Sequence, residues 1–390
     1  MSYTGKRSRN IANNANNANN ANNEGNNVQP AKKLRINGIG VISYNMSVFS
    51  AMGDKLSKFA SEFSFLQRAK ATKGTPSDFF MKALGHLKKT ADRIQAKVIG
   101  IQEFHPPTLE IIMDTLNNKN YTYHVFHKEG IANNASVLTI WDANLLGYQV
   151  GDAYDEDLGL TEGVAGLLPN DKGRPISIIK TTNNYALINF QGINRSKYYG
   201  PQPVNAPRPP GQEEGVETGV DNSNILRALI LKHTAAAGLN EIAPEKIIIM
   251  CDSNDREHAI NSETPLIIKT KVGDVGFHDN HLKDDKSAIS CCYNWDSCGV
   301  PISGGKTSLG AVGAESNYKY TGDYVLGINF LTPVTAESSE VDEETKESME
   351  SDHKLVYAIL ETPMSGGRRM RKTRRAKAKS RKTRNVKYRI

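Results

Sequence analysis

The feature that most limits the fold is a run of five apolar residues, 247–251, that is followed at once by four polar ones. A continuous apolar run of this kind is typical of a strand covered on both faces, in the interior of a layered protein. The polar residues are Asp252, Ser253, Asn254 and Asp255. Because ligands of α/β sheets bind beyond the carboxyl ends of strands, this junction is a candidate site.

Along the rest of the chain, segments with strand character alternate with segments of helical periodicity. Apolar residues recur at helical spacing in 77–96, and further helices are expected at 107–116 and 223–237. Strands are expected at residues 36–45, 97–101, 123–128, 135–142, 176–181, 185–191, 246–252, 318–326 and 355–360.

The order of these elements favours a particular class of α/β fold. The strand candidates between residues 123 and 191 follow one another mostly without helices, which indicates antiparallel pairing. Together with the helices they predict two packed mixed sheets with helices outside, and not a doubly wound parallel sheet. Two insertions, 197–222 and 336–350, have the Pro, Gly and acidic composition of surface loops.

The two ends of the chain differ in composition from its middle. The formal net charge is +7, but residues 368–389 hold 13 Lys and Arg and no acid, so the remainder is net acidic. Like charges repel, so residues 363–390 are expected to be a disordered basic tail. Residues 1–34, which contain repeated Ala-Asn-Asn, have little to bury and are expected to be disordered. One folded domain is therefore predicted at 35–362.

The basic tail bears on partners. Clustered Lys and Arg release counterions from phosphates, which favours nucleic acid, and they also suit an anionic lipid surface. A solubility tail or an import signal is the alternative interpretation. No apolar stretch is long enough to span a bilayer, so a soluble, intracellular protein is expected. In composition, the Asn repeats and the tail resemble proteins of large DNA viruses. A viral protein of this kind would lie in the host cytoplasm, the nucleus or the virion.

Cysteine usage adds little. Cys251, Cys291, Cys292 and Cys298 are too few for a disulfide framework and fit no zinc spacing, which predicts free thiols in a reducing compartment.

Polar residues stand at the ends of several predicted strands. Alone, each is as well explained by a turn or by a structural hydrogen bond. Together they supply the oxygen ligands that Mg²⁺ prefers, and an imidazole besides. Such a set can polarise a phosphoryl oxygen and prepare an attacking water, which predicts hydrolysis of a phosphate ester. The set comprises Asn45, Glu103, Asp252, Asn254, Asp323, Asp352 and His353.

These residues lie in motifs that resemble, in order, those of the endonuclease/exonuclease/phosphatase superfamily. The resemblance covers about residues 36–361 and implies a DNase I-like four-layer α/β sandwich. It also implies hydrolysis of phosphodiesters or phosphomonoesters with Mg²⁺, with Mn²⁺ as the alternative ion. The motifs are Ser-Tyr-Asn at 43–45, Ile-Gly-Ile-Gln-Glu at 99–103, Asp-Ser-Asn-Asp at 252–255, Gly-Asp-Tyr-Val-Leu at 322–326 and Ser-Asp-His at 351–353.

The resemblance implies roles for single residues. Glu103 would be the principal metal ligand, with Asn45 beside it and Asp352 near the ion. Asp252 would orient or deprotonate the nucleophilic water. Asn254 would hold the scissile phosphate.

Two further roles follow from the same resemblance. His353 would contact the phosphate and stabilise its developing charge, and Asp323 would fix this imidazole. Many members have Asn-x-His on a central strand, and the best match here is Asn189 with Gln191 in the histidine position. Both would bind substrate, although glutamine donates a hydrogen bond without carrying charge.

The substrate class is less constrained than the reaction. The superfamily includes nucleases, DNA end-processing phosphodiesterases, inositol polyphosphate phosphatases and sphingomyelinases, which share the metal centre and differ in their loops. The basic tail favours a nuclease that hydrolyses phosphodiester bonds in nucleic acid. A phosphoinositide or sphingolipid phosphoesterase and a catalytically weakened nucleic-acid-binding member are the alternatives. Oligomeric state, preference for DNA or RNA, and endo- or exonucleolytic cleavage are not predicted.

Overall fold

The structure is a computed structural model. It describes residues 2–3, 38–46, 76–127, 136–158, 174–192, 222–254, 260–280, 290, 321–337, 351 and 353–363.

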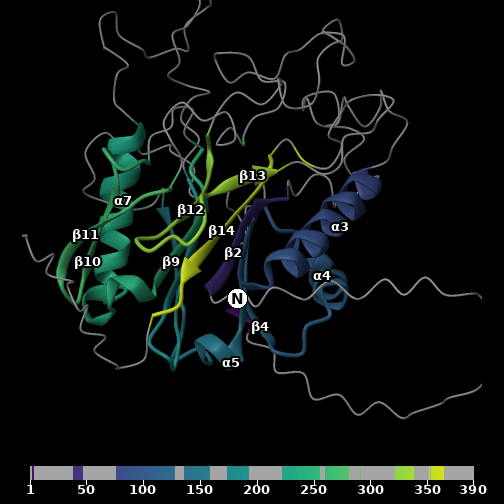
Figure 1. Cartoon of the computed structure of the whole chain (residues 1–390), viewed down its shortest axis with the longest axis horizontal. Coiled ribbons are helices and arrows are strands. Elements are labelled where there is room, and N and C mark those ends of the chain that lie inside the picture. Colours follow the sequence, from purple (N-terminus) through teal and green to yellow (C-terminus); the bar gives the residue numbers. More distant parts are fainter. Residues whose placement is uncertain are drawn as a thin grey trace, which may run out of the picture.

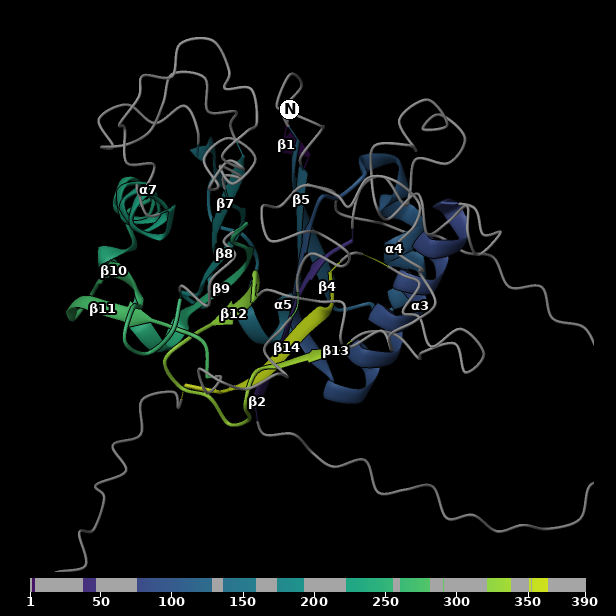
Figure 2. The same ribbon diagram turned by 90° about the horizontal axis from the view of Figure 1, so that it is seen from above.

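Two sheets pack face to face in the centre of the molecule, and helices cover their outer faces. Figure 2 shows the layers edge-on, with α3 and α4 on one side and α7 with the β10–β11 hairpin on the other. Figure 1 gives the element labels. The helices are α3 (Pro76–Ile94), α4 (Leu109–Leu116), α5 (Ala143–Leu146) and α7 (Asn222–Ala236).

The first sheet has seven strands in the order β1-β4-β5-β3-β2-β14-β13. Its neighbours are antiparallel except β2 and β3, which run parallel. The strands are β1 (Ser2–Tyr3), β2 (Gly38–Asn45), β3 (Ala96–Gln102), β4 (Tyr121–His127), β5 (Ser136–Asp142), β13 (Thr335–Glu337) and β14 (Leu355–Glu361).

The second sheet has five strands in the order β12-β9-β8-β7-β6, and only β8 and β9 run parallel. Both sheets are therefore mixed, and the predicted four-layer α/β sandwich is confirmed. The strands are β6 (Tyr154–Asp157), β7 (Pro175–Lys180), β8 (Ala186–Gln191), β9 (Ile247–Asp252) and β12 (Asp323–Leu326).

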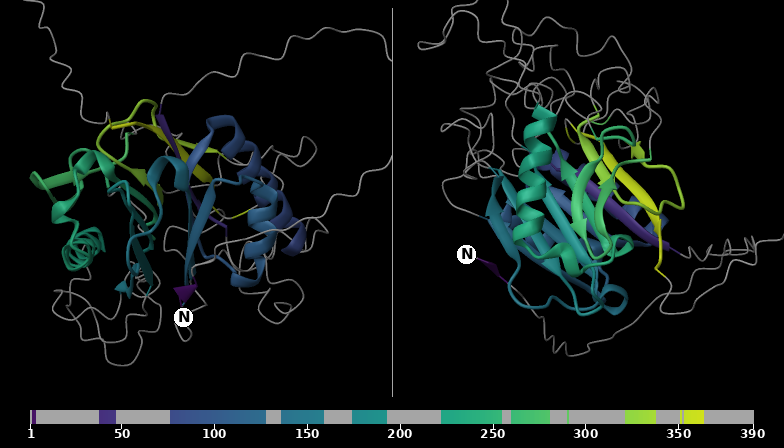
Figure 3. Two further views of the ribbon diagram at one scale, coloured as in Figure 1. Left: turned by 90° about the horizontal axis from the view of Figure 1, so that it is seen from below. Right: turned by 90° about the vertical axis from the view of Figure 1, so that its left-hand side faces the viewer.

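Strand β9 is buried along its whole length, as its apolar sequence predicts. Ile247, Ile249 and Cys251 pack on the outer side against α7, whereas Ile248 and Met250 pack between the two sheets. Alternate residues of one strand thus serve two cores, because successive side chains point to opposite faces of a sheet. The left view of Figure 3 shows the sheets between their helical layers, and the right view shows α7 in front of the sheets.

Several elements were not predicted. β6 is an edge strand of sequence Tyr-Asp-Glu-Asp, whose acids have low strand propensity. β10 (Leu266–Thr270) and β11 (Gly273–Phe277) form a separate hairpin. β13 begins where the insertion 336–350 was expected to be a loop. Because short or edge strands carry a weak periodic signal, their sequences resemble those of loops.

Other predictions lie mostly outside the described residues. These are the disordered segments 1–34 and 363–390, the insertion 197–222, and the thiols Cys291, Cys292 and Cys298. Among the helices that the structure describes, none combines the length and the apolar character that crossing a membrane requires.

Candidate active site

Strand topology brings predicted residues to one edge of the sandwich, the edge at which strands β2, β3, β8 and β9 end. The parallel strands β2 and β3 place Asn45 beside Gln102, and the parallel strands β8 and β9 place Gln191 beside Asp252. Strand β12 is antiparallel to β9 and begins at this same edge, so Asp323 lies opposite Asp252. Residues far apart in sequence therefore share one end of the two sheets.

The inward face of each parallel strand changes from apolar to polar as it approaches this edge. Because every second residue of a strand faces the same way, the change is visible at intervals of two along the chain. The inward series are Ile39, Val41, Ser43 and Asn45 in β2; Val98, Gly100 and Gln102 in β3; Leu187, Asn189 and Gln191 in β8; and Ile248, Met250 and Asp252 in β9.

Asn45 links the two sheets at this edge. Its Nδ2 donates to Oδ2 of Asp252 at 2.9 Å and lies 3.4 Å from Nε2 of His353. All three side chains are buried. An amide, a carboxylate and an imidazole thus meet where the two sheets come together.

Asp323 holds the other nitrogen of the same imidazole. Both of its carboxylate oxygens lie 3.0 Å from Nδ1 of His353. The backbone N–H of Asp323 donates to Oγ of Ser290 at 3.0 Å. Burial raises the pKa of Asp323 to about 6, His353 opposes this rise, and the nearby charge of Asp252 adds to it. The carboxyl group of Asp323 therefore changes its ionisation state near pH 6.

Ser351 fixes the segment that carries the imidazole. Its hydroxyl donates to the backbone oxygen of Asn45 at 2.9 Å and accepts from the backbone N–H of His353 at 3.2 Å. The Ser-Asp-His motif thus uses its serine to attach the histidine to the end of β2. Asp352, the middle residue of this motif, lies outside the described residues.

The ends of β8 and β9 approach each other closely at Gly192. A Cβ on this glycine would lie 1.9 Å from the backbone oxygen of Ser253, so a side chain does not fit. Asn254, in the left-handed conformation with φ 53°, donates from its backbone to Asp252 Oδ1 at 2.9 Å and from its side chain to the oxygen of Gly192 at 2.8 Å. The backbone bond directs the Asp252 carboxylate, and the side-chain bond ties the end of β9 to the end of β8.

Glu103 is held from the second sheet. Nε2 of Gln191 donates to its Oε1 at 2.7 Å, and Nη1 of Arg174 donates to Oε1 of Gln191 at 3.2 Å. Arg174 precedes β7 and was not predicted as a site residue, because a lone arginine before a strand carries no pattern of its own.

Asn189 is placed apart from these residues. Its amide lies between the sheets, where it accepts from Gln102 at 2.8 Å and donates to the Leu138 backbone oxygen at 3.0 Å and to Thr139 Oγ1 at 3.2 Å. Gly100 lets the two sheets approach closely here, since a Cβ there would lie 2.7 Å from Cβ of Met250 and 3.3 Å from the Asn189 side chain. Asn189 therefore lies between the two sheets, two residues before Gln191 in β8, and not at the end of the strand.

Three side chains at this edge form a candidate metal site. Asp252, Asp323 and His353 each offer a ligand atom, and these atoms lie within 4.8 Å of one another. The predicted ligands Asn45 and Glu103 bring further oxygen atoms to the same edge, and oxygen is the donor that Mg²⁺ prefers.

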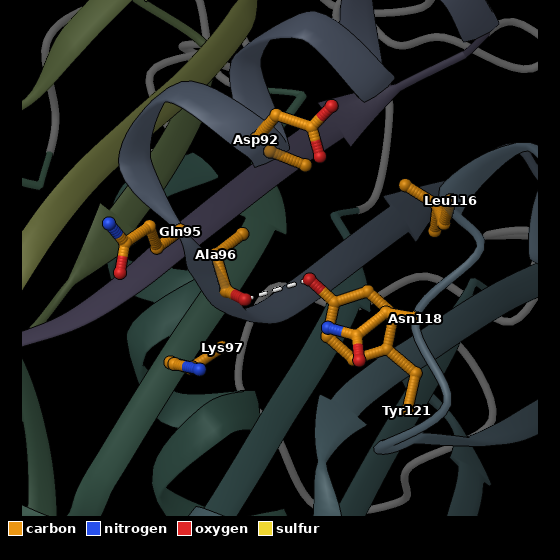
Figure 4. Close-up of a pocket in the computed structure, with 8 residues that line it drawn as sticks. Asp92, Gln95, Ala96, Lys97, Leu116, Asn118 and Tyr121 are labelled. Atoms are coloured by element: carbon orange, nitrogen blue, oxygen red, sulfur yellow. Dashed lines mark hydrogen bonds between the residues drawn. The ribbon is translucent and has the colours of Figure 1, made fainter. Parts of the chain in front are cut away.

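A hollow elsewhere in the molecule does not coincide with this site. It has a volume of about 270 Å³ and lies where β3 begins, at the opposite end of the strand from Glu103 (Figure 4). Its wall includes the hydrogen bond from the Tyr121 hydroxyl to the Ala96 backbone oxygen, 2.7 Å long. None of the predicted site residues belongs to its lining, which is formed by Ala91, Asp92, Gln95, Ala96, Lys97, Leu116, Asn118 and Tyr121.

Comparison of the sequence with protein-family models gives no match, and comparison with curated proteins gives none either. Comparison with solved structures does give matches. An endonuclease/exonuclease/phosphatase from Bacteroides vulgatus is 12% identical, with 83% of this chain and 98% of that chain covered and a TM-score of 0.43.

Two further solved structures are similar at the same level. D. rerio TDP2, in complex with a single-strand DNA product, is 13% identical, with 83% of this chain and 99% of that chain covered and a TM-score of 0.40. A mannosyl-6-phosphatase from Bacteroides thetaiotaomicron is 12% identical, with 82% and 98% covered and a TM-score of 0.44.

Proposed function

We propose that the chain is a metal-dependent phosphoesterase that hydrolyses phosphodiester bonds in nucleic acid. The observation that carries the proposal is the buried array in which Asn45 contacts both Asp252 and His353 while Asp323 holds the far side of the imidazole. Burying two carboxylates and an imidazole together is costly unless they pair and hydrogen-bond. A buried carboxyl group with a raised pKa, such as that of Asp323, within a cluster of this kind favours a catalytic function.

In this proposal Asp252 accepts the proton of the attacking water. Hydrogen bonds from the Asn45 side chain and the Asn254 backbone fix the direction of its carboxylate. A base held in this way loses little entropy when it meets the water. Asn254 holds the phosphate beside it.

His353 stabilises the charge that develops on the phosphate. Asp323 accepts from Nδ1 of the imidazole, so Nε2 is the nitrogen that faces the reacting group. Asp323 in this role orients the ring and favours its protonated form, because a carboxylate beside an imidazole stabilises positive charge.

Glu103, Asn45 and Asp352 would hold Mg²⁺ or Mn²⁺ in this proposal. When bound there, the cation supplies positive charge that offsets the charge building up on the phosphoryl oxygens. The donor chemistry at the edge supports a hard cation.

Nucleic acid is the proposed substrate because of the charge of the chain. The 13 Lys and Arg within 368–389 can each pair with a backbone phosphate and add affinity that does not depend on sequence. The same charges suit an anionic lipid, so a phosphoinositide or sphingolipid phosphoesterase is the second candidate.

The test is a substrate panel with the full chain and with a chain lacking residues 366–390. DNA, RNA and phosphoinositide vesicles are each incubated with Mg²⁺, with Mn²⁺ and with a chelator. We expect metal-dependent cleavage of nucleic acid that weakens without the tail and more so at raised salt. If phosphate is released from the vesicles faster than nucleic acid is cleaved, the substrate is a phosphoinositide and not nucleic acid.

Two variants and a control assign the reaction to this edge. Asp252→Asn and Glu103→Ala are expected to abolish cleavage without changing the unfolding transition. Asp92→Asn is the matched control, because Asp92 is an exposed carboxylate in a surface ion pair with Lys88. Cleavage that persists in both site variants, or binding without any turnover in the unaltered chain, would overturn the proposal.

A further inference from the structure

The polar side chains Arg174, Gln191 and Glu103 form a connected row at the edge of the sandwich. Gln191 is fully buried and lies in the middle of the row, with the guanidinium on one side and the carboxylate on the other. A buried amide with two charged neighbours is bonded strongly, because hydrogen bonds to charged groups are worth more than neutral ones.

The direction of the amide is determined by its neighbours. A guanidinium only donates hydrogen bonds and a carboxylate only accepts them. The carbonyl oxygen of Gln191 must therefore face Arg174, and its NH₂ group must face Glu103. Reversing the amide would set donor against donor at one end and acceptor against acceptor at the other.

The backbone at Glu103 gives a reason why such a restraint is needed. Glu103 has φ 49°, in the left-handed region, which a residue with a Cβ adopts at a cost of about 1–2 kcal/mol. The bond from Met46 N to Gln102 O, 3.2 Å, and the bond from Phe104 N to Ser136 O, 3.0 Å, hold the backbone on either side. This turn brings the carboxylate to the second sheet, where Gln191 donates to it.

We propose that Arg174 and Gln191 are positioning residues for the metal ligand Glu103: the guanidinium orients the amide, and the amide orients the carboxylate toward the cation. This inference rests on the proposed function and assigns Gln191 to the metal ligand instead of to the phosphate. It explains how a neutral glutamine serves where the resemblance implies a histidine. The positive charge is present one amide further away, on Arg174.

The test measures metal binding without substrate. Full-length protein is titrated with MgCl₂ and separately with MnCl₂ in a calorimeter. We expect Gln191→Leu, which removes both hydrogen bonds at nearly constant size, to weaken binding about 10- to 100-fold, the range typical of lost partners of metal ligands. Arg174→Met is expected to weaken binding less, because Gln191 then still donates to Glu103 in one of its two orientations.

The double variant tests whether the two residues act together. Two changes in one row are not additive, so Gln191→Leu with Arg174→Met should bind metal no more weakly than Gln191→Leu alone. Arg227→Met is the control, because Arg227 also donates to a side-chain amide, that of Asn224, at 2.7 Å on the exposed side of α7. It should leave metal affinity unchanged.

Gln191→His provides a variant that keeps a donor to Glu103 should the leucine variant fail to fold. If Gln191→Leu folds, Gln191→His is expected to bind metal more tightly than Gln191→Leu. If Gln191→Leu does not fold, Gln191→His is compared with the original chain and is expected to bind metal with nearly the original affinity. Unchanged metal affinity in Gln191→Leu and Arg174→Met, or additive losses in the double variant, would overturn the proposal that the two residues position Glu103. Absence of metal binding in the unaltered chain would instead overturn the proposed function, so the two failures are distinct.

Discussion

Two His–Asp pairs join the sheets, one on each side of the sandwich, and they differ in their surroundings. His353 and Asp323 meet at the strand ends, where Asn45 and Asp252 lie on the other side of the ring. His124 of β4 meets Asp155 of β6 at 2.8 Å in mid-strand.

The second pair has no such neighbours. Among the described residues nothing pairs with Nδ1 of His124, with Oδ1 of Asp155, or with the hydroxyl of Ser177, which lies opposite Asp155 in the register of β6 and β7. Burial and pairing are thus common to both pairs. What distinguishes the first is that its second ring nitrogen faces Asn45, which in turn contacts Asp252, at the ends of the strands. The comparison therefore predicts a catalytic role for the first pair and a structural role for the second.

The largest expected effect is on catalysis. Replacing His353 with Ala should lower kcat/KM for nucleic acid by about 10²- to 10⁴-fold, the usual contribution of a proton-transferring or charge-stabilising side chain. His124→Asn, assayed at equal concentrations of folded protein, should remain within about twofold of the original rate, since none of its described contacts reaches the site. A similar loss in both variants would remove the distinction between the pairs.

The next effect is on stability. Asp155→Ala removes the carboxylate that contacts the buried His124, and leaving a buried polar group without a partner costs about 1–3 kcal/mol. Urea unfolding should therefore show a much lower midpoint for this variant, while the rate per folded molecule is preserved. Asp92→Asn, which breaks an exposed pair, should change the unfolding free energy by no more than about 1 kcal/mol. Equal losses in the two variants would contradict a cohesive role for the buried pair.

The pH dependence of the first pair follows from Asp323, whose pKa burial raises to about 6. Activity needs the ionised carboxylate to hold the imidazole, so kcat/KM should rise through pH 6 and change about tenfold between pH 5 and pH 7. Asp323→Asn should be slow at every pH and should not show this rise of kcat/KM with pH. If the rise persists in Asp323→Asn, it is caused by the ionisation of another group.

The same pKa bears on stability with the opposite sign. The folded carboxyl holds its proton more tightly than the unfolded one, whose pKa lies near 3.8, so this group favours the folded state most below that pH. Its contribution is lost as pH rises toward 6. The difference in unfolding free energy between the original chain and Asp323→Asn should therefore vary over this interval and be flat above it.

The smallest expected effect concerns Ser177. A buried hydroxyl without a partner pays for its desolvation and gains nothing in return. Ser177→Ala should leave the unfolding free energy unchanged or raise it by up to about 1 kcal/mol, with no effect on rate. A loss of more than about 1 kcal/mol would indicate that the hydroxyl is hydrogen-bonded, and that the second pair belongs to a larger polar network.

The strand pattern of the sequence was sufficient for the architecture. The apolar run ending at Cys251 indicates layers on both faces, and strands without intervening helices indicate antiparallel pairs. Edge strand β6 was missed, because three acids in four residues do not look like a strand until a neighbour supplies its hydrogen bonds.

For the site, the sequence determined which residue types end the strands, and the order of motifs named Asn45, Glu103, Asp252, Asp323 and His353. It could not determine which of them touch, since Asn45 and Asp252 are 207 residues apart and meet only when the two sheets pack. No sequence pattern marks Arg174, because its proposed role depends on a contact with Gln191, which lies on the neighbouring strand. Local periodicity fixes faces and ends of strands, whereas the pairing of one end with another depends on how the sheets are stacked.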